Sequence, residues 1–315
     1  MNSAAFLVDT GPKVGLGHLR RSCVLLDAMV EAGFQCRLYC ADIAASGRAA
    51  HAMPTSPADL PTADVIICDS YRLDRAFLTG LRTRCRVLLA FDDTAERDLD
   101  ADIVLNHNIY GGQLDYSRRT RGQVLTGPEY ALIDRRILAT AESYRQHPPV
   151  NDVIVSFGGT DDGARGAQAA QILLARSKDH IHLVVAPGAT PAAGALTLAA
   201  TQPQRVTLHH GPDMAALLSR VRVYVGGAGV TALEALVIGL DLVLVMLAPN
   251  QRLNAEAMAH SGQAVIVADE PQEITLATVS MLERPRVLKP NPVDGLGARR
   301  VIAAIEQLLT SKPAV

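Results

Sequence analysis

Apolar and polar positions alternate along the first half of the chain in short blocks that predict strands and helices in turn. Continuous apolar runs predict strands at Ala4–Val8, Gln35–Cys40, Asp64–Asp69, Arg86–Asp92 and Asp102–Leu105. Apolar residues at helical spacing, such as Leu19, Cys23, Leu26 and Val30, predict helices at about 18–32, 73–83 and 133–145. Strands that are apolar throughout and separated by helices are typical of a parallel sheet covered on both faces.

A second series of the same kind follows His147–Asn151, where adjacent prolines predict a linker. Its apolar runs predict strands at Val153–Phe157, His180–Ala186, Arg205–His209, Arg222–Val225, Leu242–Leu247 and Ala264–Val267. Its helical patterns lie at about 164–176, 213–219, 230–239 and 251–261, with a last helix at about 295–309. We expect an α/β protein with two Rossmann-like domains, residues 1–147 and 151–315. Packing of the last helix back on the first domain is an open alternative. Ligands of such folds bind where the strands end, here in the cleft between the domains.

Composition narrows the function classes. The 30 basic and 32 acidic residues nearly cancel, which argues against nucleic acid or a membrane surface as partner. No apolar run is long enough to span a bilayer and no signal sequence is recognisable, so we expect a cytoplasmic protein. The cysteines at 23, 36, 40, 68 and 85 lack CxxC spacing, which disfavours a zinc site and predicts buried thiols.

The stretch from Gly15 to Arg21 links the first strand to the first helix and is a candidate ligand loop. Gly15 and Gly17 allow close approach of a ligand to the backbone, and His18 falls in the first helical turn. The positive end of the helix dipole disfavours imidazolium, so His18 is expected to be neutral and able to accept a proton. A tight turn with a capping histidine explains the same residues equally well.

Polar residues recur after the other strands of the first half. The ends of successive strands present Asp9, Asp69 with Tyr71, Asp92 with Asp93, Asn106, and Tyr130 after Gly127. Each alone is explained by a helix cap or a turn, and a capping role for the paired aspartates is favoured over a metal site. Their recurrence at one rim favours a binding site.

The second half contains two glycine turns that each follow a strand. Gly158-Gly159-Thr160 precedes one helix, and Gly226-Gly227-Ala228-Gly229 leads to Thr231 and Glu234 in another. Backbone N–H groups at helix starts bind phosphates, and Glu234 could accept hydrogen bonds from ribose hydroxyls. Asn250-Gln251 offers amides at the next strand end. Together these predict a diphosphate ligand, a nucleotide, although Glu234 could equally be a glutamate that complements the helix dipole.

The ordered set of motifs resembles the PseG-type nucleotide-sugar hydrolases of pseudaminic acid biosynthesis, relatives of the MurG-like glycosyltransferases with the GT-B fold. The matching pieces are Asp9, Gly15-Leu16-Gly17-His18 with Arg21, Asp69-Ser70-Tyr71, Phe91-Asp92-Asp93, Asp102–Asn106 with Asn108 and Tyr110, Gly127 with Tyr130–Ile133, Phe157–Asp161, Thr231 with Glu234, and Ala248 with Asn250-Gln251. The first strand departs from the family, which usually has an arginine near Leu7, and Lys13 is a further departure in the first loop.

The resemblance implies hydrolysis of a UDP-linked diacetamido-trideoxy-altropyranose, or of a close relative of that sugar, at the anomeric C–O bond, for nonulosonic acid synthesis and flagellin glycosylation. It places the catalytic base at His18 and needs no metal or other cofactor. It implies a sugar-side set made of Asp9, Gly15, Gly17, Arg21, Asp69, Tyr71, Asp92, Asn106 and Tyr130. It implies a nucleotide-side set made of Gly158, Gly159, Thr160, Gly229, Thr231, Glu234, Asn250 and Gln251.

Three alternatives stay open. A GT-B glycosyltransferase would pass the sugar to an acceptor, an epimerase would act on the sugar itself, and a binding protein would hold the nucleotide sugar without catalysis. The first domain shows no apolar or basic patch for a membrane-bound acceptor in its sequence, which favours water as the acceptor.

Overall fold

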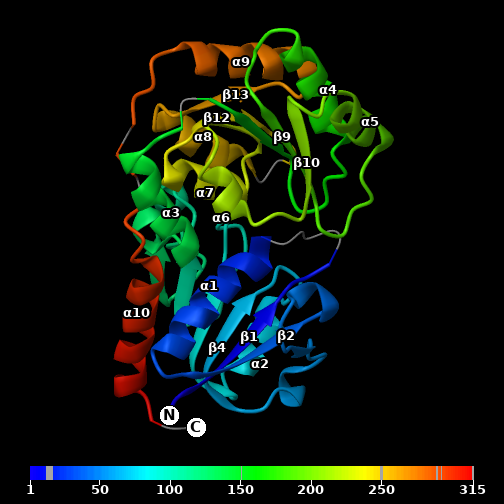
Figure 1. Cartoon of the computed structure of the whole chain (residues 1–315). Helices are drawn as coiled ribbons and strands as arrows, with labels where there is room; N and C mark the ends of the chain where they lie inside the picture. Colours follow the sequence, from blue (N-terminus) through cyan, green and yellow to red (C-terminus); the bar gives the residue numbers. More distant parts are fainter. Residues whose placement is uncertain (12–16, 150, 249–250, 289, 292, 314–315) are drawn as a thin grey trace. The chain divides into compact units, whose positions relative to one another are not determined.

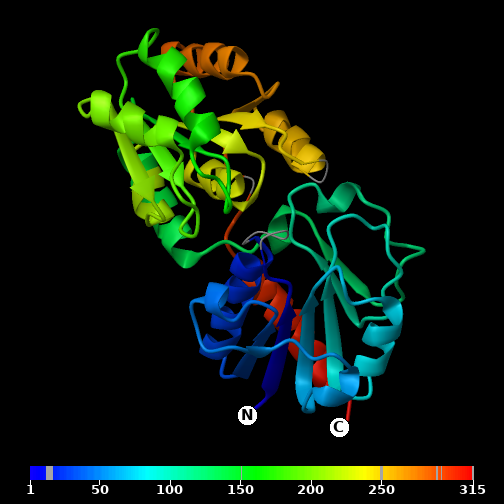
Figure 2. The same cartoon turned by 90° about the vertical axis from the view of Figure 1, so that its right-hand side faces the viewer.

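The computed structural model describes residues 1–11, 17–149, 151–248, 251–288, 290–291 and 293–313. The chain divides into two compact units (Figures 1 and 2). Unit 1 contains residues 1–133 and 293–315, and unit 2 contains residues 134–292. Each unit is an α/β fold built on its own parallel sheet, as the alternation of strand and helix patterns predicts.

Unit 1 holds a seven-stranded sheet in the order β3-β2-β1-β4-β5-β6-β7. The strands are β1 (Ser3–Val8), β2 (Gln35–Cys40), β3 (His51–Ala52), β4 (Ala63–Asp69), β5 (Cys85–Phe91), β6 (Ile103–Asn106) and β7 (Gln123–Thr126). The helices are α1 (Gly17–Glu31), α2 (Arg75–Leu81) and α10 (Gly297–Ser311). All strand pairs are parallel, so every strand ends at the same edge of the sheet.

Alternate strand residues of unit 1 enter different cores. Phe6 and Val8 of β1 pack with α1 and α10 on one face, whereas Leu7 packs with α2 on the other. In α1, Leu19, Leu25, Leu26 and Met29 are buried, but Val30 is 51% exposed and does not share the predicted apolar face. Leu7 is fully buried in the sheet, so this departure from the family pattern lies in the core and not at the rim.

Helix α10 is the last helix of the sequence but belongs to unit 1. Its buried side chains Val301, Ile302, Ile305 and Leu309 join the same apolar core as β1 and β4. Both views show it, in red, alongside the strands of this unit (Figures 1 and 2). Gly297 fits only without a side chain, because a Cβ there would lie 2.3 Å from the carbonyl oxygen of Ala131.

Unit 2 holds a six-stranded sheet in the order β10-β9-β8-β11-β12-β13. The strands are β8 (Val153–Ser156), β9 (Ile181–Val185), β10 (Val206–His210), β11 (Val223–Gly227), β12 (Asp241–Val245) and β13 (Ala264–Val267). The helices are α3 (Arg135–Gln146), α4 (Ala164–Leu174), α5 (Ala193–Thr201), α6 (Met214–Leu218), α7 (Val230–Ile238), α8 (Arg252–His260) and α9 (Pro271–Glu283). Helices α4, α5 and α9 cover one face and share its apolar core.

The structure differs from the sequence pattern in four elements and in one boundary. Strands β3 and β7 and helices α5 and α9 were not predicted. Unit 2 begins at Asp134, before the predicted linker at 147–151, because α3 packs against α7 of that unit. Within the described residues, no helix is both long and apolar enough to cross a membrane.

Candidate functional site

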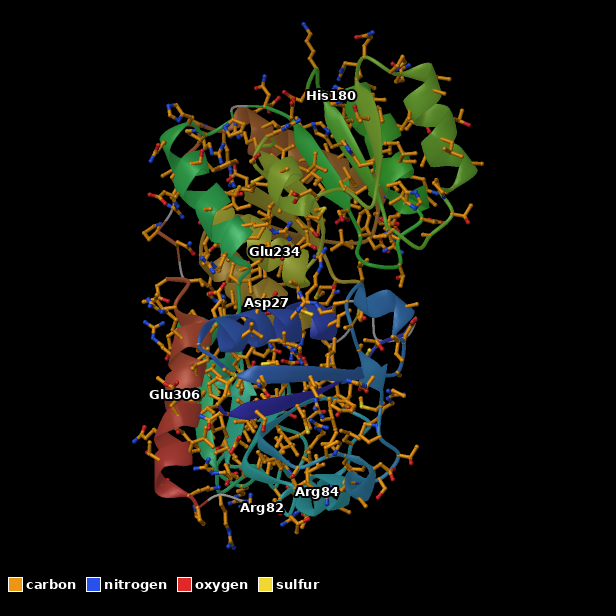
Figure 3. All side chains as sticks on the ribbon, turned by 60° about the horizontal axis from the view of Figure 1, so that its bottom comes forward. Asp27, Arg82, Arg84, His180, Glu234 and Glu306 are labelled. Atoms are coloured by element: carbon orange, nitrogen blue, oxygen red, sulfur yellow. The ribbon has the colours of Figure 1, made fainter. Side chains whose placement is uncertain are left out.

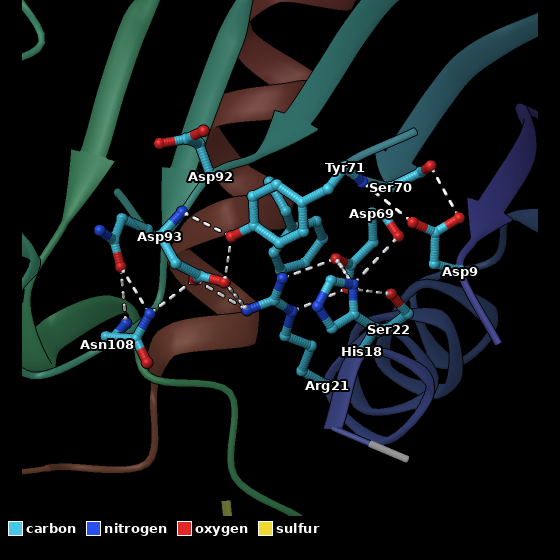
Figure 4. A network of polar contacts seen from close by, with 12 residues as sticks. Asp9, His18, Arg21, Ser22, Asp69, Ser70, Tyr71, Asp92, Asp93 and Asn108 are labelled. Carbon is cyan, nitrogen blue, oxygen red and sulfur yellow. Dashed lines mark hydrogen bonds and ion pairs between the residues drawn. The ribbon is translucent and has the colours of Figure 1, made fainter. Parts of the chain in front are cut away.

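The carboxyl edge of the unit 1 sheet gathers buried acidic side chains. Asp9 follows β1, Asp69 ends β4, and Asp92 follows β5, and each is at most 1% exposed. Helix α1 begins beside this edge and brings His18 and Arg21 to it (Figure 4). Carboxylates buried this deeply are expected to have charged or hydrogen-bonded partners.

Arg21 joins two of the carboxylates. Its Nε and Nη2 donate to the two oxygens of Asp69 at 2.7 and 2.6 Å. Its Nη1 donates to both oxygens of Asp93 at 2.8 Å. The guanidinium also lies over the ring of Phe91, 4.9 Å from its centroid. Burial raises the pKa of Asp69, but the charges of Arg21 and His18 and the hydrogen bonds from both side chains together lower it by more, so the pKa lies well below its usual value.

His18 contacts the same carboxylate from the first turn of α1. Its Nδ1 lies 2.9 Å from Asp69 Oδ1, and the side chain is 14% exposed. The imidazole also meets the Tyr71 ring edge to face, with ring centroids 5.3 Å apart. A carboxylate on Nδ1 fixes the tautomer that carries its proton there, and Nε2 is then the nitrogen that can accept one.

The expectation of a neutral His18 set by the helix dipole needs correction. Burial lowers the pKa of His18, but the charge and the hydrogen bond of Asp69 raise it by more, so the pKa is raised above 6.5. The carboxylate of Asp69 is therefore the main cause that raises the pKa of His18. A histidine with a raised pKa can still act as a general base in its neutral form.

The two adjacent aspartates after β5 have different tasks. Asp92, chosen from the sequence as a sugar-side residue, accepts hydrogen bonds from the backbone N–H groups of Thr94 and Ala95 and from Arg97 Nε. It shapes a turn in which Ala95 has a positive φ of 55°. Asp93 instead faces Arg21 and accepts from Tyr71 Oη at 2.6 Å. Asp92, the predicted sugar-side residue, thus has internal partners, whereas Asp93 contacts Arg21.

Asp9 and Asn106 form internal hydrogen bonds with the loops next to the site. Asp9 accepts from Ser70 Oγ, the backbone N–H of Tyr71 and Arg72 Nε, and so fixes the loop after β4. Asn106 is fully buried, and its side chain accepts from the backbone N–H of Asn108 and donates to Tyr116 Oη. Both were predicted to face the sugar, but the contacts that the structure gives them are internal.

Two predicted sugar-side residues lie elsewhere or outside the description. Tyr130 packs against the apolar core shared with α10, and none of its described contacts reaches His18. Gly17 is the first residue of α1. Gly15 and Lys13 lie outside the described residues.

Residues outside the predicted sugar-side set complete the network. Asn108 donates to Asp93 Oδ1 at 2.6 Å, Ser22 donates to Asp69 Oδ2 at 2.9 Å, and Tyr110 donates to the carbonyl of Asp93. His107 is 3% exposed, and burial lowers its pKa to about 4, so it is neutral. Asn108 and Tyr110 belong to the motif after β6, and that motif was the available signal.

In unit 2, the first glycine turn is arranged differently from expectation. Gly158, Gly159 and Thr160 are exposed and precede α4 by several residues. The side chain of Asp161 accepts from the backbone N–H groups of Phe157 and Gly163 at 3.0 and 2.9 Å. A carboxylate of the chain itself thus takes two of the donors that an anion would use.

The second glycine turn leads directly into α7. Gly226 allows close packing, because a Cβ there would lie 1.9 Å from the carbonyl oxygen of Ser156. Gly229 is the N-cap of α7, has no side-chain cap and has open space around it. Thr231 is half-buried in the first turn, and Glu234 is 8% exposed on the same helix (Figure 3). This helix start fits an anion better than the turn before α4.

The amide pair after β12 is only partly described. Gln251 Oε1 accepts from the backbone N–H of Leu247 at 3.1 Å, and its side chain lies beside Gly227. Asn250 lies outside the described residues. No group of three histidine, cysteine or acidic residues in the described part of the chain has an arrangement that could hold a metal ion.

Comparison with known proteins identifies the fold. No model of a known protein family matches the chain. An uncharacterised protein of Methanocaldococcus jannaschii is 23% identical over 193 residues, which cover 58% of this chain. The aligned region spans only 40% of that relative's length.

Several solved structures are similar over nearly the whole chain. They include the glycotransferase of kitacinnamycin (TM-score 0.62, 15% identity, 98% of this chain and 95% of that chain) and MurG of Acinetobacter baumannii (TM-score 0.61, 14% identity, 98% and 100%). MnaA of S. aureus, solved with UDP, has a TM-score of 0.59 at 12% identity over 100% and 99% of the two chains. The chain therefore has the two-sheet α/β architecture of the GT-B fold.

Proposed function

We propose that the chain hydrolyses a UDP-linked deoxyamino sugar at the anomeric C–O bond and releases UDP and the free sugar. The observation that carries the proposal is the His18–Asp69 pair at the carboxyl edge of the unit 1 sheet, with Arg21 holding Asp69 ionised. The names of similar structures, MnaA with UDP and a UDP-N-acetylglucosamine 2-epimerase of Listeria monocytogenes, support a UDP-sugar as the substrate class.

The chemistry assigned to unit 1 is general base catalysis. Asp69 accepts the hydrogen bond from Nδ1 of His18, and Nε2 takes a proton from water. The water oxygen forms a bond to the anomeric carbon while the bond from that carbon to the diphosphate oxygen breaks. UDP leaves with the bonding electron pair, and His18 later returns its proton to solvent.

The role assigned to unit 2 is to bind the leaving nucleotide. The start of α7 at Gly229 and Thr231 is assigned to the diphosphate, because backbone N–H groups at a helix start can stabilise a negative charge. Glu234 lies on α7, and Gln251 lies directly before α8. Both residues are assigned to binding of the nucleoside. These assignments rest on helix geometry and on the resemblance of the motifs.

An assay without acceptor tests the proposal. The protein is incubated with UDP-linked diacetamido and acetamido sugars, and free UDP is quantified. His18→Asn is expected to lower the rate about a thousandfold, since a positioned base contributes that order of acceleration. The control His51→Asn replaces an exposed histidine of unit 1 and is expected to keep full activity.

Other outcomes overturn hydrolysis and identify a different activity. Turnover only with an added sugar acceptor would indicate a glycosyltransferase, the activity named for the kitacinnamycin structure. Conversion of the sugar without UDP release would indicate an epimerase. Binding without turnover of any sugar would indicate a nucleotide-sugar binding protein.

A further inference from the structure

Unit 1 has a charged cavity at the edge of the sheet opposite to His18. Its volume is about 820 Å³, and it lies where β6 and β7 begin and α2 ends. Because all strands of this sheet are parallel, their starts lie at the edge away from the carboxyl ends. Figure 3 marks Arg82, one of its lining residues, near Arg84 in unit 1. The cavity is therefore distinct from the candidate functional site.

The lining of this cavity is rich in arginine. Five arginines and three aspartates line it: Arg75, Arg82, Arg118, Arg119, Arg121, Asp98, Asp100 and Asp102. Each of these aspartates forms an ion pair with at least one neighbouring cation. Asp98 pairs with Arg75 and Arg119, Asp100 with Arg82, and Asp102 with Arg82 and Lys312.

Arg118 and Arg121 lack such a partner. Both are exposed, and neither forms an ion pair with any carboxylate among the residues that the structure describes. The pKa of the exposed Asp115 is lowered mainly by hydrogen bonds from Ser117, and the charges of Arg118 and Arg119 add less. The cavity thus keeps an excess of positive charge on two side chains that can turn toward a ligand.

The loop that carries these arginines is fixed by its backbone. The carbonyl of Arg119 accepts from the N–H of Leu99 at 2.7 Å, and Thr120 Oγ1 accepts from the N–H of Gly122 at 3.0 Å. Gly122 fits tightly, since a Cβ there would lie 2.3 Å from the carbonyl oxygen of Ala101. The loop is positioned without a ligand, which lowers the entropy cost of binding one.

We propose that this cavity binds a small phosphorylated metabolite through Arg118 and Arg121. Guanidinium groups match phosphate oxygens in charge and in bidentate geometry. A cavity of this volume lies within the range that accommodates nucleotide-sized ligands. The paired arginines and aspartates form its polar wall, and the two remaining cations favour a ligand with at least two negative charges.

Arginine footprinting on the unmodified chain tests the site. The protein is treated with phenylglyoxal with and without inorganic pyrophosphate, and modified peptides are identified by mass spectrometry. Pyrophosphate is expected to protect Arg118 and Arg121 but not the exposed Arg37 and Arg299, which lie outside the cavity in the same unit. Equal modification of Arg118 and Arg121 with and without pyrophosphate would overturn the proposal.

A pair of matched variants gives the second test. Calorimetric titration with pyrophosphate compares the wild type with the Arg118→Gln/Arg121→Gln double variant and with Arg37→Gln/Arg299→Gln, which loses the same charge. Loss of charged hydrogen bonds is expected to weaken binding about tenfold or more in the first variant only. Binding of pyrophosphate at the candidate nucleotide site of unit 2 is expected to persist in both variants. Equal affinities in all three proteins, or equal loss in both variants, would contradict the proposal.

Discussion

Arg21 is the residue on which the geometry of the candidate site depends. It is buried and holds Asp69 and Asp93 through four hydrogen bonds of 2.6–2.8 Å. Both carboxylates are held ionised mainly by this guanidinium, which lowers the pKa of each against burial. The position and charge of Asp69, and through it those of His18, therefore depend on one cation.

Removal of this cation is expected to be costly. Arg21→Gln leaves two carboxylates close together without compensation, and the free energy of unfolding of unit 1 should fall by about 3–5 kcal/mol. Arg48→Gln is the control, because Arg48 pairs with Asp27 at 2.8 Å on the exposed surface. Its loss should cost less than about 1 kcal/mol. Urea denaturation measures the free energy of unfolding of both variants. Equal losses would show that the buried ion pairs of Arg21 stabilise the protein no more than an exposed pair does.

The pH dependence of activity reports on the His18–Asp69 pair. A base must be neutral, so activity should fall as the pH falls through the raised pKa of His18. In Asp69→Asn the carboxylate that raises this pKa is absent, while burial and the charge of Arg21 still lower it. The acid limb of kcat/KM should therefore move down by about one pH unit or more. An acid limb that stays in place in folded Asp69→Asn would exclude His18 as the titrating base. The control Asp27→Asn replaces an exposed carboxylate and should leave the acid limb unchanged.

For single residues, the sequence predicted which side chains gather at the carboxyl edge of the unit 1 sheet better than it predicted the role of each side chain. Asp69, His18, Arg21 and Tyr71 do meet, because parallel strands end at one edge and α1 starts beside it. Which of Asp92 and Asp93 turns toward Arg21 depends on the turn after β5, and sequence spacing does not encode that choice. The pKa of His18 likewise depends on a carboxylate 51 residues away along the chain.

At the scale of elements, the turn between β11 and α7 carries a sharp steric requirement. A side chain at Gly226 would collide with the backbone of β8, whereas one at Gly229 would meet nothing within 4 Å. The strand packing and the helix start are thus controlled by different glycines of one motif.

Two alanine substitutions separate these tasks. Gly226→Ala is expected to destabilise unit 2 by about 3 kcal/mol, because backbone atoms cannot give way to the new methyl group. Gly229→Ala should leave stability nearly unchanged. Thermal unfolding of both variants measures the difference. Similar melting temperatures would mean that the approach of β11 to β8 is looser than the structure indicates.

The elements that sequence reasoning missed have clear physical reasons. Helix α5 reads AGALTLAAT, and its apolar residues surround the helix without a defined face. Helix α9 is rich in β-branched residues, and its Thr275 and Thr278 are buried while donating to backbone carbonyls. Strand β3 spans two residues, too few for a periodic signal. Packing on the sheet, rather than local preference, determines these elements.

At the scale of the whole molecule, unit 1 is assembled from both ends of the chain. Helix α10 supplies Val301, Ile302 and Ile305 to a core whose strands β1 and β4 precede it by more than 220 residues. Unit 1 therefore cannot complete its core until the last helix is present. The sequence pattern predicted this helix and gave packing back on the first domain as an alternative, and the structure places it there.

Truncation of one side chain in α10 tests this dependence. Ile305 is fully buried, and Ile305→Ala should lower the stability of unit 1 by about 2–5 kcal/mol. The control Leu276→Ala lies on α9 of unit 2 and is 55% exposed, so it should change stability by about 0.5 kcal/mol or less. Hydrogen exchange followed by peptide mass spectrometry should show faster exchange in β1 and β4 but not in unit 2. Unaltered exchange in those strands would contradict the assignment of α10 to this core.

The most direct test of the account is the fate of the water oxygen. The wild type is supplied with a cleavable UDP-linked sugar, without acceptor, in water enriched in the heavy oxygen isotope, and the released nucleotide is analysed by mass spectrometry. Attack by water at the anomeric carbon predicts released UDP that carries no heavy oxygen. The rate of this release is expected to fall about a thousandfold in His18→Asn. Heavy oxygen in the nucleotide, or unchanged release by His18→Asn, would contradict the central claim.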